Sequence, residues 1–171
     1  MCQNLIGRLT LSRLGLEASM DPKRVRAGQL MQRRVFCVPP QMPVRELAKK
    51  LDRRGLEGGV VVDGGGNLLG VVSKSDVYHY QREGTRGPDA LAFFRQHLID
   101  GLSAASPADV PDLARVRDIM RPSAVEFPEN ASVDRIAQAM RRRRLLRVLI
   151  TSGRKVRGLL TAMDLLKLLE S

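Results

Sequence analysis

The sequence is poor in aromatic residues and in cysteine. Aromatic side chains make up 4% of the 171 residues and tryptophan is absent, so the sequence shows no stacking platform of the kind that binds single-stranded nucleic acid. Cys2 and Cys37 are the two cysteines. Neither has a Cys or His partner at the spacing of metal ligands. We therefore interpret both thiols as structural or incidental.

The sequence also lacks a long hydrophobic run. No segment approaches the roughly 20 apolar residues that a membrane-spanning helix needs, and the N-terminal residues lack the pattern of a cleavable signal peptide. We therefore expect a cytoplasmic protein without a membrane segment. With 43% apolar residues, the chain is long enough to bury the core of one sizeable domain or of two small ones.

Acidic residues are scarce relative to basic ones. There are 18 Asp and Glu against 29 Lys and Arg, a formal charge of +11, which attracts anionic partners without identifying them. Four consecutive arginines, 141–144, spread around a helix and form no single stripe. We interpret them as a solvated helix end, with phosphate capture or polyanion binding as alternatives. His79 and His97 are isolated and no nucleophile–base arrangement is legible, so we expect neither a metal site nor catalysis.

The most informative feature is an internal duplication. Segments 31–76 and 120–164 carry the same apolar, turn and acidic signals at an almost constant offset. Each contains an apolar quartet with helical i, i+3, i+4, i+7 spacing, and the two quartets lie 89 positions apart. The quartets are Val44, Leu47, Ala48 and Leu51 in the first copy and Val133, Ile136, Ala137 and Met140 in the second.

Each copy predicts the order strand, helix, strand, strand, helix. The expected elements of the first copy are 35–38, a helix from Pro43 to near Gly55, 59–62, 68–73 and a helix opening at 73–76; those of the second are 124–127, 132–144, 148–151, 156–161 and 164–169. We divide the chain into an N-terminal extension with a possible helix (1–22), repeat 1 (23–78), a connector with an inserted helix (79–113) and repeat 2 (114–171). Neither repeat covers its own sheet, so the two are expected to pack together.

A hydroxyl residue and an aspartate lie three positions apart where the third strand of each repeat gives way to a helix. The pairs are Ser73 with Asp76 and Thr161 with Asp164. Two interpretations are open. The pairs are helix caps that satisfy backbone N–H groups, or they form ligand sites, in which the carboxylate accepts from the ribose hydroxyls and the helix start attracts phosphate. Recurrence in both repeats supports the second interpretation without excluding the first.

The combined pattern resembles a cystathionine-β-synthase (CBS) domain, and two in tandem resemble a Bateman module. The motifs are Asp118-Ile119-Met120, a strand into Pro128, Ser132-Val133, a glycine-containing hairpin and Gly158-x-x-Thr161-x-x-Asp164. The resemblance covers about 25–78 and 114–169. It implies an α+β fold of two β-α-β-β-α units packed through their sheets with pseudo-twofold symmetry. It also implies a non-enzymatic module, pairing as a homodimer, and two clefts for AMP, ADP, ATP or S-adenosylmethionine as regulatory ligand, with no obligatory cofactor.

The resemblance also implies roles for single residues. Asp76 and Asp164 would hold ribose, and Ser73 and Thr161 would contact ribose or phosphate. Arg147 would place a cation against phosphate. Strand residues would flank adenine: Phe36, Gly58, Ala124 and Val125. Because the first copy has Glu57-Gly58-Gly59 around the position of Arg147, we expect the Thr161/Asp164/Arg147 cleft to be the better phosphate site. The Ser73/Asp76 cleft is left for a weak, uncharged or cationic adenosyl ligand, or for none.

These observations give three hypotheses for function. In the first, an adenosyl ligand binds between the repeats and its occupancy is passed to an unidentified effector protein. In the second, the +11 charge serves a basic nucleic-acid-binding accessory protein. In the third, the repeats form a ligand-free dimerisation scaffold and the aspartates are only caps.

Overall fold

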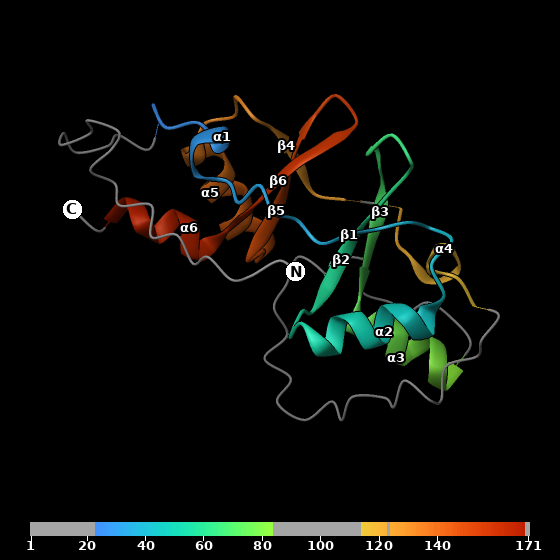
Figure 1. The fold of residues 1–171 in the computed structure, drawn as a ribbon. Helices are drawn as coiled ribbons and strands as arrows, with labels where there is room; N and C mark the ends of the chain where they lie inside the picture. Colours follow the sequence, from blue (N-terminus) through green and yellow to red (C-terminus); the bar gives the residue numbers. More distant parts are fainter. Residues whose placement is uncertain (1–22, 84–113, 123, 170–171) are drawn as a thin grey trace.

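The computed structural model describes residues 23–83, 114–122 and 124–169. Each repeat folds around a three-stranded sheet, in the orders β1-β2-β3 and β4-β5-β6, with a parallel first pair and an antiparallel second pair. Repeat 1 contains β1 (Cys37–Val38), α2 (Val44–Arg53), β2 (Gly58–Val62), β3 (Leu68–Ser73) and α3 (Lys74–Glu83). Repeat 2 contains β4 (Glu126–Pro128), α5 (Val133–Arg143), β5 (Arg147–Ser152), β6 (Lys155–Thr161) and α6 (Ala162–Leu166), which continues as the short 3-10 turn η3 (Lys167–Leu169). The predicted α+β fold of two β-α-β-β-α repeats is confirmed (Figure 1).

The two apolar quartets form the buried faces of α2 and α5. Three members of each quartet are buried and the alanines are half-buried. Ser132 caps α5 by accepting a hydrogen bond from the Arg135 backbone N–H, and Arg144 ends it in the left-handed conformation. Arginines 141–144 are exposed. Pro43 lies at the N-cap of α2, one residue before the position predicted for it.

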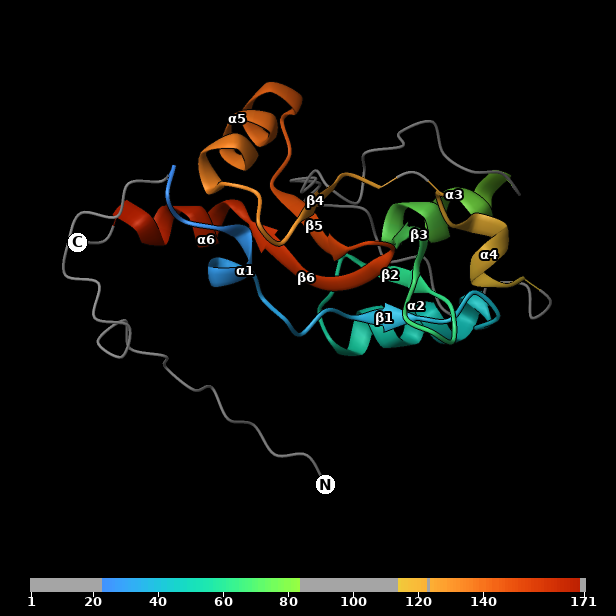
Figure 2. The ribbon, with the colours of Figure 1, turned by 90° about the horizontal axis from the view of Figure 1, so that it is seen from above.

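Two short helices that the sequence did not predict, α1 (Ala27–Leu30) and α4 (Val116–Ile119), pack on the opposite repeat. The Ala27 N–H donates to the carbonyl of Ala131 at 2.9 Å, and the Val116 N–H donates to the carbonyl of Met42 at 2.9 Å. In both views α1 lies beside α6, and α4 lies beside α2 and α3 (Figures 1 and 2). The N-terminal segments of the two repeats are therefore exchanged.

The core reflects this exchange. One buried cluster joins Ala27 and Met31 to the sheet of repeat 2, together with Val60 and Val71. The other joins Ala114, Val116 and Ile119 to the core of repeat 1. Each hydrophobic core therefore contains residues of both repeats, as expected from the uncovered sheet faces.

Several strand boundaries differ from the prediction. β1 and β4 begin two residues later than expected, because the register with β2 starts at Cys37 and that with β5 starts at Glu126. Residues 79–83, which were assigned to the connector, form the end of α3. The helix expected within 1–22 and the helix expected to be inserted in the connector lie outside the described residues. Within the described part of the chain, none of the helices has the length and apolar character needed to cross a membrane.

Candidate functional site

The exchanged segments run along the third strand of the opposite repeat. Gln32 pairs with Leu159 of β6 through two backbone hydrogen bonds of 2.8 and 2.9 Å. Arg121 pairs in the same way with Val71 of β3, also at 2.8 and 2.9 Å. These two bridges place residue 32 beside the start of α6 and residue 121 beside the start of α3.

Glycine in each motif makes this approach possible. A Cβ on Gly158 would lie 2.6 Å from the Met31 sulfur and 2.9 Å from the Gln32 carbonyl oxygen. A Cβ on Gly70 would collide with the carbonyl oxygen of Arg121. The motif Gly-x-x-Ser/Thr-x-x-Asp therefore combines a glycine that admits the opposite segment with an aspartate three residues beyond the following hydroxyl.

The hydroxyl and aspartate pairs both have capping-box geometry. Asp164 Oδ2 accepts from the Thr161 backbone N–H at 2.9 Å and from Thr161 Oγ1 at 2.7 Å. Asp76 Oδ2 accepts the same two hydrogen bonds from Ser73, at 2.8 and 2.7 Å. Each aspartate also donates its own N–H to the hydroxyl oxygen. In both repeats the cap engages Oδ2, and a side chain from the opposite repeat donates to Oδ1.

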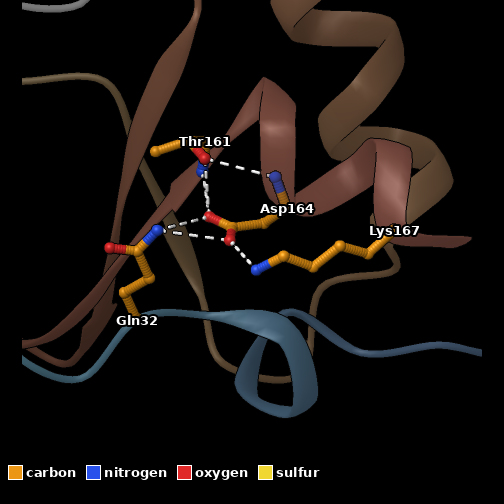
Figure 3. A network of polar contacts seen from close by, with 4 residues as sticks. All are labelled: Gln32, Thr161, Asp164 and Lys167. Atoms are coloured by element: carbon orange, nitrogen blue, oxygen red, sulfur yellow. Dashed lines mark hydrogen bonds and ion pairs between the residues drawn. The ribbon is translucent and has the colours of Figure 1, made fainter. Parts of the chain in front are cut away.

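The remaining partners of Asp164 are Gln32 and Lys167 (Figure 3). Gln32 Nε2 lies 3.2 and 3.1 Å from the two carboxylate oxygens, and Lys167 Nζ lies 2.8 Å from Oδ1. Burial by itself would raise the pKa of Asp164, but the hydrogen bonds from Lys167, Thr161 and Gln32 outweigh it, so the pKa lies below its ordinary value. This carboxylate is therefore ionised at neutral pH and able to accept further hydrogen bonds.

Asp76 has a different partner. The Nε of Arg121 lies 2.8 Å from Asp76 Oδ1, and both side chains are buried, with exposed fractions of 10% and 1%. Gln32, the counterpart of Arg121, is exposed. The two carboxylates therefore share their capping hydrogen bonds but differ in the charge and the exposure of the group that reaches them from the opposite repeat.

A cavity of about 340 Å³ lies between the repeats, next to Gln32. It is lined by Gln32, Arg34, Val35, Phe36, Arg54, Leu56, Glu57, Gly58, Gly59, Val60, Arg147 and Leu159. This volume is within the range of small-molecule sites. The sequence grouped Glu57 and Gly58 with the Asp76 cleft, whereas the structure places them, with Phe36, in the cavity that Gln32 lines. Thr161 and Asp164 do not line this cavity, and Asp164 is connected to it through the amide of Gln32. The grouping differs because strand residues of one repeat face the acid of the other.

The cavity is rich in cationic side chains. Arg34, Arg54 and Arg147 line it together with a single acid, Glu57. The Arg54 guanidinium lies 5.1 Å from the centroid of the Phe36 ring, a cation–π distance. Burial lowers the pKa of Arg147 and the nearby Glu57 carboxylate opposes that effect. The lining is therefore suited to an anionic ligand with a flat apolar part.

Ala124 and Val125 occupy the positions of Val35 and Phe36 in repeat 2. They pack in the hydrophobic cluster of that repeat, and the Val125 carbonyl accepts from the Leu149 N–H at 2.9 Å. Neither residue lines the 340 Å³ cavity. Of the residues expected to flank adenine or phosphate, Phe36, Gly58 and Arg147 therefore line this cavity, whereas Ala124 and Val125 do not. Gln32, which also lines the cavity, contacts Asp164.

Gln32, Arg121 and Lys167 were not selected from the sequence. The signal for the first two was present, because each follows the methionine that opens its repeat, Met31 or Met120, at the same 89-residue offset. Lys167 lies three residues after Asp164, one helical turn away. Among residues 23–83, 114–122 and 124–169, no group of three or more His, Cys, Asp or Glu side chains could hold a metal ion.

A family model supports the resemblance found in the motifs. The model described as CBS domain matches residues 27–83 and 116–171, more than half of the chain. No curated protein sequence matches the chain.

Solved structures share the fold. A CBS domain-containing protein of unknown function from Kribbella flavida is 24% identical, with a TM-score of 0.62 over 86% of this chain and 99% of that one. CBSX2 in complex with AMP is 21% identical, with a TM-score of 0.61 over 83% and 93%. The CBS domain pair of protein MJ0100, in complex with 5′-methylthioadenosine and S-adenosyl-L-methionine, is 16% identical, with a TM-score of 0.59 over 85% and 96%.

Proposed function

The chain belongs to the CBS domain family, and from that premise we propose that it is a non-enzymatic regulatory module that binds an adenosine-containing ligand in the cavity beside Asp164. The observation that carries the proposal is a 340 Å³ cavity lined by arginines and glycines, one of whose lining residues, Gln32, donates to the ionised carboxylate of Asp164. Related CBS pairs hold AMP or S-adenosyl-L-methionine in their solved structures, which supports the ligand class.

Asp164 is the proposed acceptor for the ribose diol. An ionised carboxylate has only acceptor sites, and vicinal hydroxyls supply two donors at matching positions. The amide of Gln32 now donates to the same two oxygens at 3.1 and 3.2 Å. Because Gln32 is exposed, it can turn toward solvent when the sugar takes its place, and no buried group is left without a partner.

The other parts of the ligand have partners in the same cavity. Phe36 and Leu159 offer apolar surface to the base, and the absence of a side chain at Gly59 lets the Phe36 ring lie against the backbone of β2. Arg147 is the proposed phosphate ligand, since a guanidinium donates two parallel hydrogen bonds to phosphate oxygens. An adenine nucleotide fits these groups better than S-adenosylmethionine, whose sulfonium would face three arginines.

Regulation would follow from the position of the cavity between the repeats. A ligand that touches both repeats favours the arrangement in which they close on it. At about 100 times its dissociation constant a ligand stabilises the bound state by roughly 2.7 kcal/mol, which is comparable with common allosteric couplings. We expect the module to act in the cytoplasm, where such nucleotides occur, and as a homodimer that passes its occupancy to an effector protein.

Isothermal titration calorimetry with AMP, ATP and S-adenosylmethionine tests the proposal. We expect AMP or ATP to bind, and Asp164→Ala to weaken binding about 10- to 100-fold, the effect of losing hydrogen bonds to a charged group. Asp134→Ala is the matched control, because this carboxylate lies in the first turn of α5, where it accepts from Gln138 at 2.9 Å, and Asp134 does not line the cavity. The Asp134→Ala variant should bind the nucleotide with the affinity of the unmodified protein.

The same titrations separate the alternatives. Binding of a short oligonucleotide that falls steeply with salt, together with indifference to free nucleotides, would favour the nucleic-acid accessory protein, which the +11 charge suggests. A flat response to every adenosyl compound would favour the dimerisation scaffold. Nucleotide affinity that survives Asp164→Ala unchanged would remove the proposed site.

A further inference from the structure

We propose that Arg121 closes the Ser73/Asp76 cleft to adenosyl ligands, so that each chain binds one ligand molecule, at the Asp164 cleft. This inference rests on the proposed function and adds to it the number of working sites and the residue that sets that number.

The two clefts are built alike, which makes the comparison direct. Residues 32 and 121 are 89 positions apart, pair with the third strand of the opposite repeat and send a side-chain donor to the aspartate there. The capping distances differ by no more than about 0.1 Å between the two repeats. The difference is chemical, since a neutral exposed amide reaches Asp164 and a buried guanidinium reaches Asp76.

Both oxygens of Asp76 are already engaged. Ser73 donates two hydrogen bonds to Oδ2, and Arg121 Nε donates to Oδ1 at 2.8 Å. A ribose diol would have to separate Arg121 from Asp76 and leave the guanidinium at a buried position without its carboxylate. Breaking a buried ion pair in this way weakens a competing interaction by about 100- to 1,000-fold or more. Arg121 therefore acts as a resident occupant of this cleft.

The donors at Asp164 are easier to displace. Gln32 is neutral and exposed. The side chain of Lys167 is 56% exposed, so water can replace its carboxylate partner. Neither group leaves a buried charge behind when a sugar takes its place. We therefore expect a ribose diol to bind Asp164 but not Asp76.

Stoichiometry measured by equilibrium dialysis with labelled AMP and ATP tests this inference. Counting only sites with about the affinity of the unmodified protein, we expect one per chain for the unmodified protein, two for Arg121→Gln, none for Asp164→Ala, whose site is weakened, and one for the double variant Arg121→Gln/Asp164→Ala. Arg121→Gln copies the residue found at position 32. Arg157→Gln is the matched control, because this half-exposed arginine pairs with Glu129 at 3.1 Å outside both clefts, and it should leave one molecule per chain.

The double variant distinguishes the two proposals. If the unmodified protein binds no nucleotide, the proposed function fails, yet binding by the double variant would still support closure by Arg121. If neither Arg121 variant gains a molecule, or if the unmodified protein binds two, the inference is overturned. Arg121→Met, neutral and of similar length, takes the place of Arg121→Gln if that variant does not fold.

Discussion

Replacing Gly70 by alanine should be strongly destabilising, because the new methyl group would meet backbone atoms. It would collide with the Arg121 carbonyl oxygen, and it would lie 3.0 Å from the Arg121 carbonyl carbon and 3.2 Å from the Pro122 Cα. No rotamer change relieves contacts with backbone. The segment at 121–122 must move away from β3 to make room.

The magnitude follows from what that movement breaks. Two backbone hydrogen bonds join Arg121 to Val71, each contributing about 1 kcal/mol. The Arg121–Asp76 ion pair is buried, and separating the two partners of such a pair costs about 3–5 kcal/mol. The segment can shift without breaking all of these contacts completely, so the expected effect is smaller than their sum. We expect the free energy of unfolding to fall by about 3–5 kcal/mol. That loss would lower Tm by roughly 6–20 °C.

Urea unfolding followed by circular dichroism measures this loss, and two other glycines calibrate it. Gly64→Ala should change stability by less than about 0.5 kcal/mol, since nothing lies within 4 Å of the added Cβ. Gly158→Ala should destabilise by an intermediate amount, about 1–3 kcal/mol. The shortest contact of its added Cβ is to the flexible Met31 side chain, at 2.6 Å. Equal midpoints for Gly70→Ala and Gly64→Ala would refute the close approach of the exchanged segment.

Two further predictions concern charge and capping. The pKa of Asp164 is lowered from its ordinary value of 3.8, so its ionised form stabilises the fold above that pH, and the contribution disappears as the pH falls through the lower, folded-state pKa. The stability gap between the unmodified protein and Asp164→Asn should therefore be larger at pH 7 than at pH 3 in urea titrations, and a gap independent of pH would contradict the assignment of the carboxylate as ionised. Ser132→Ala removes the hydroxyl that accepts from the Arg135 N–H at the start of α5 and should lower the free energy of unfolding by about 1 kcal/mol. Ser152→Ala, at an exposed hairpin position, should change it by less than about 0.5 kcal/mol, and similar losses for the two serine variants would argue against the cap.

Much of the fold was predictable because its signals are local and occur twice. The helical quartets predicted α2 and α5, and the expected strands at 59–62 and 68–73 correspond to β2 and β3. The short helices α1 and α4 were missed because they have only four residues each. Such a helix is not stable on its own, and the hydrogen bonds that hold Ala27 and Val116 come from the opposite repeat.

The sequence predicted the two aspartates of the candidate sites but not the side chains that contact them from the opposite repeat. Asp76 and Asp164 could be selected because a cap and a ligand acceptor share the same short motif. Arg121 contacts an aspartate 45 positions away and Gln32 one 132 positions away, and no local pattern encodes such distances. Gly70 and Gly158 were visible as parts of the motif, but the segments they admit belong to the other repeat, so their purpose became clear only in three dimensions.

The exchange of N-terminal segments has a consequence for how this chain could have evolved. Its contacts follow a twofold axis, so two separate copies of a single ancestral repeat could form them as a dimer. Such a dimer would carry the same residue in both clefts, since one gene would encode both halves. Fusion into one polypeptide lifts that restriction and makes the association intramolecular. Glutamine at position 32 and arginine at position 121 then become independent choices, open to separate selection.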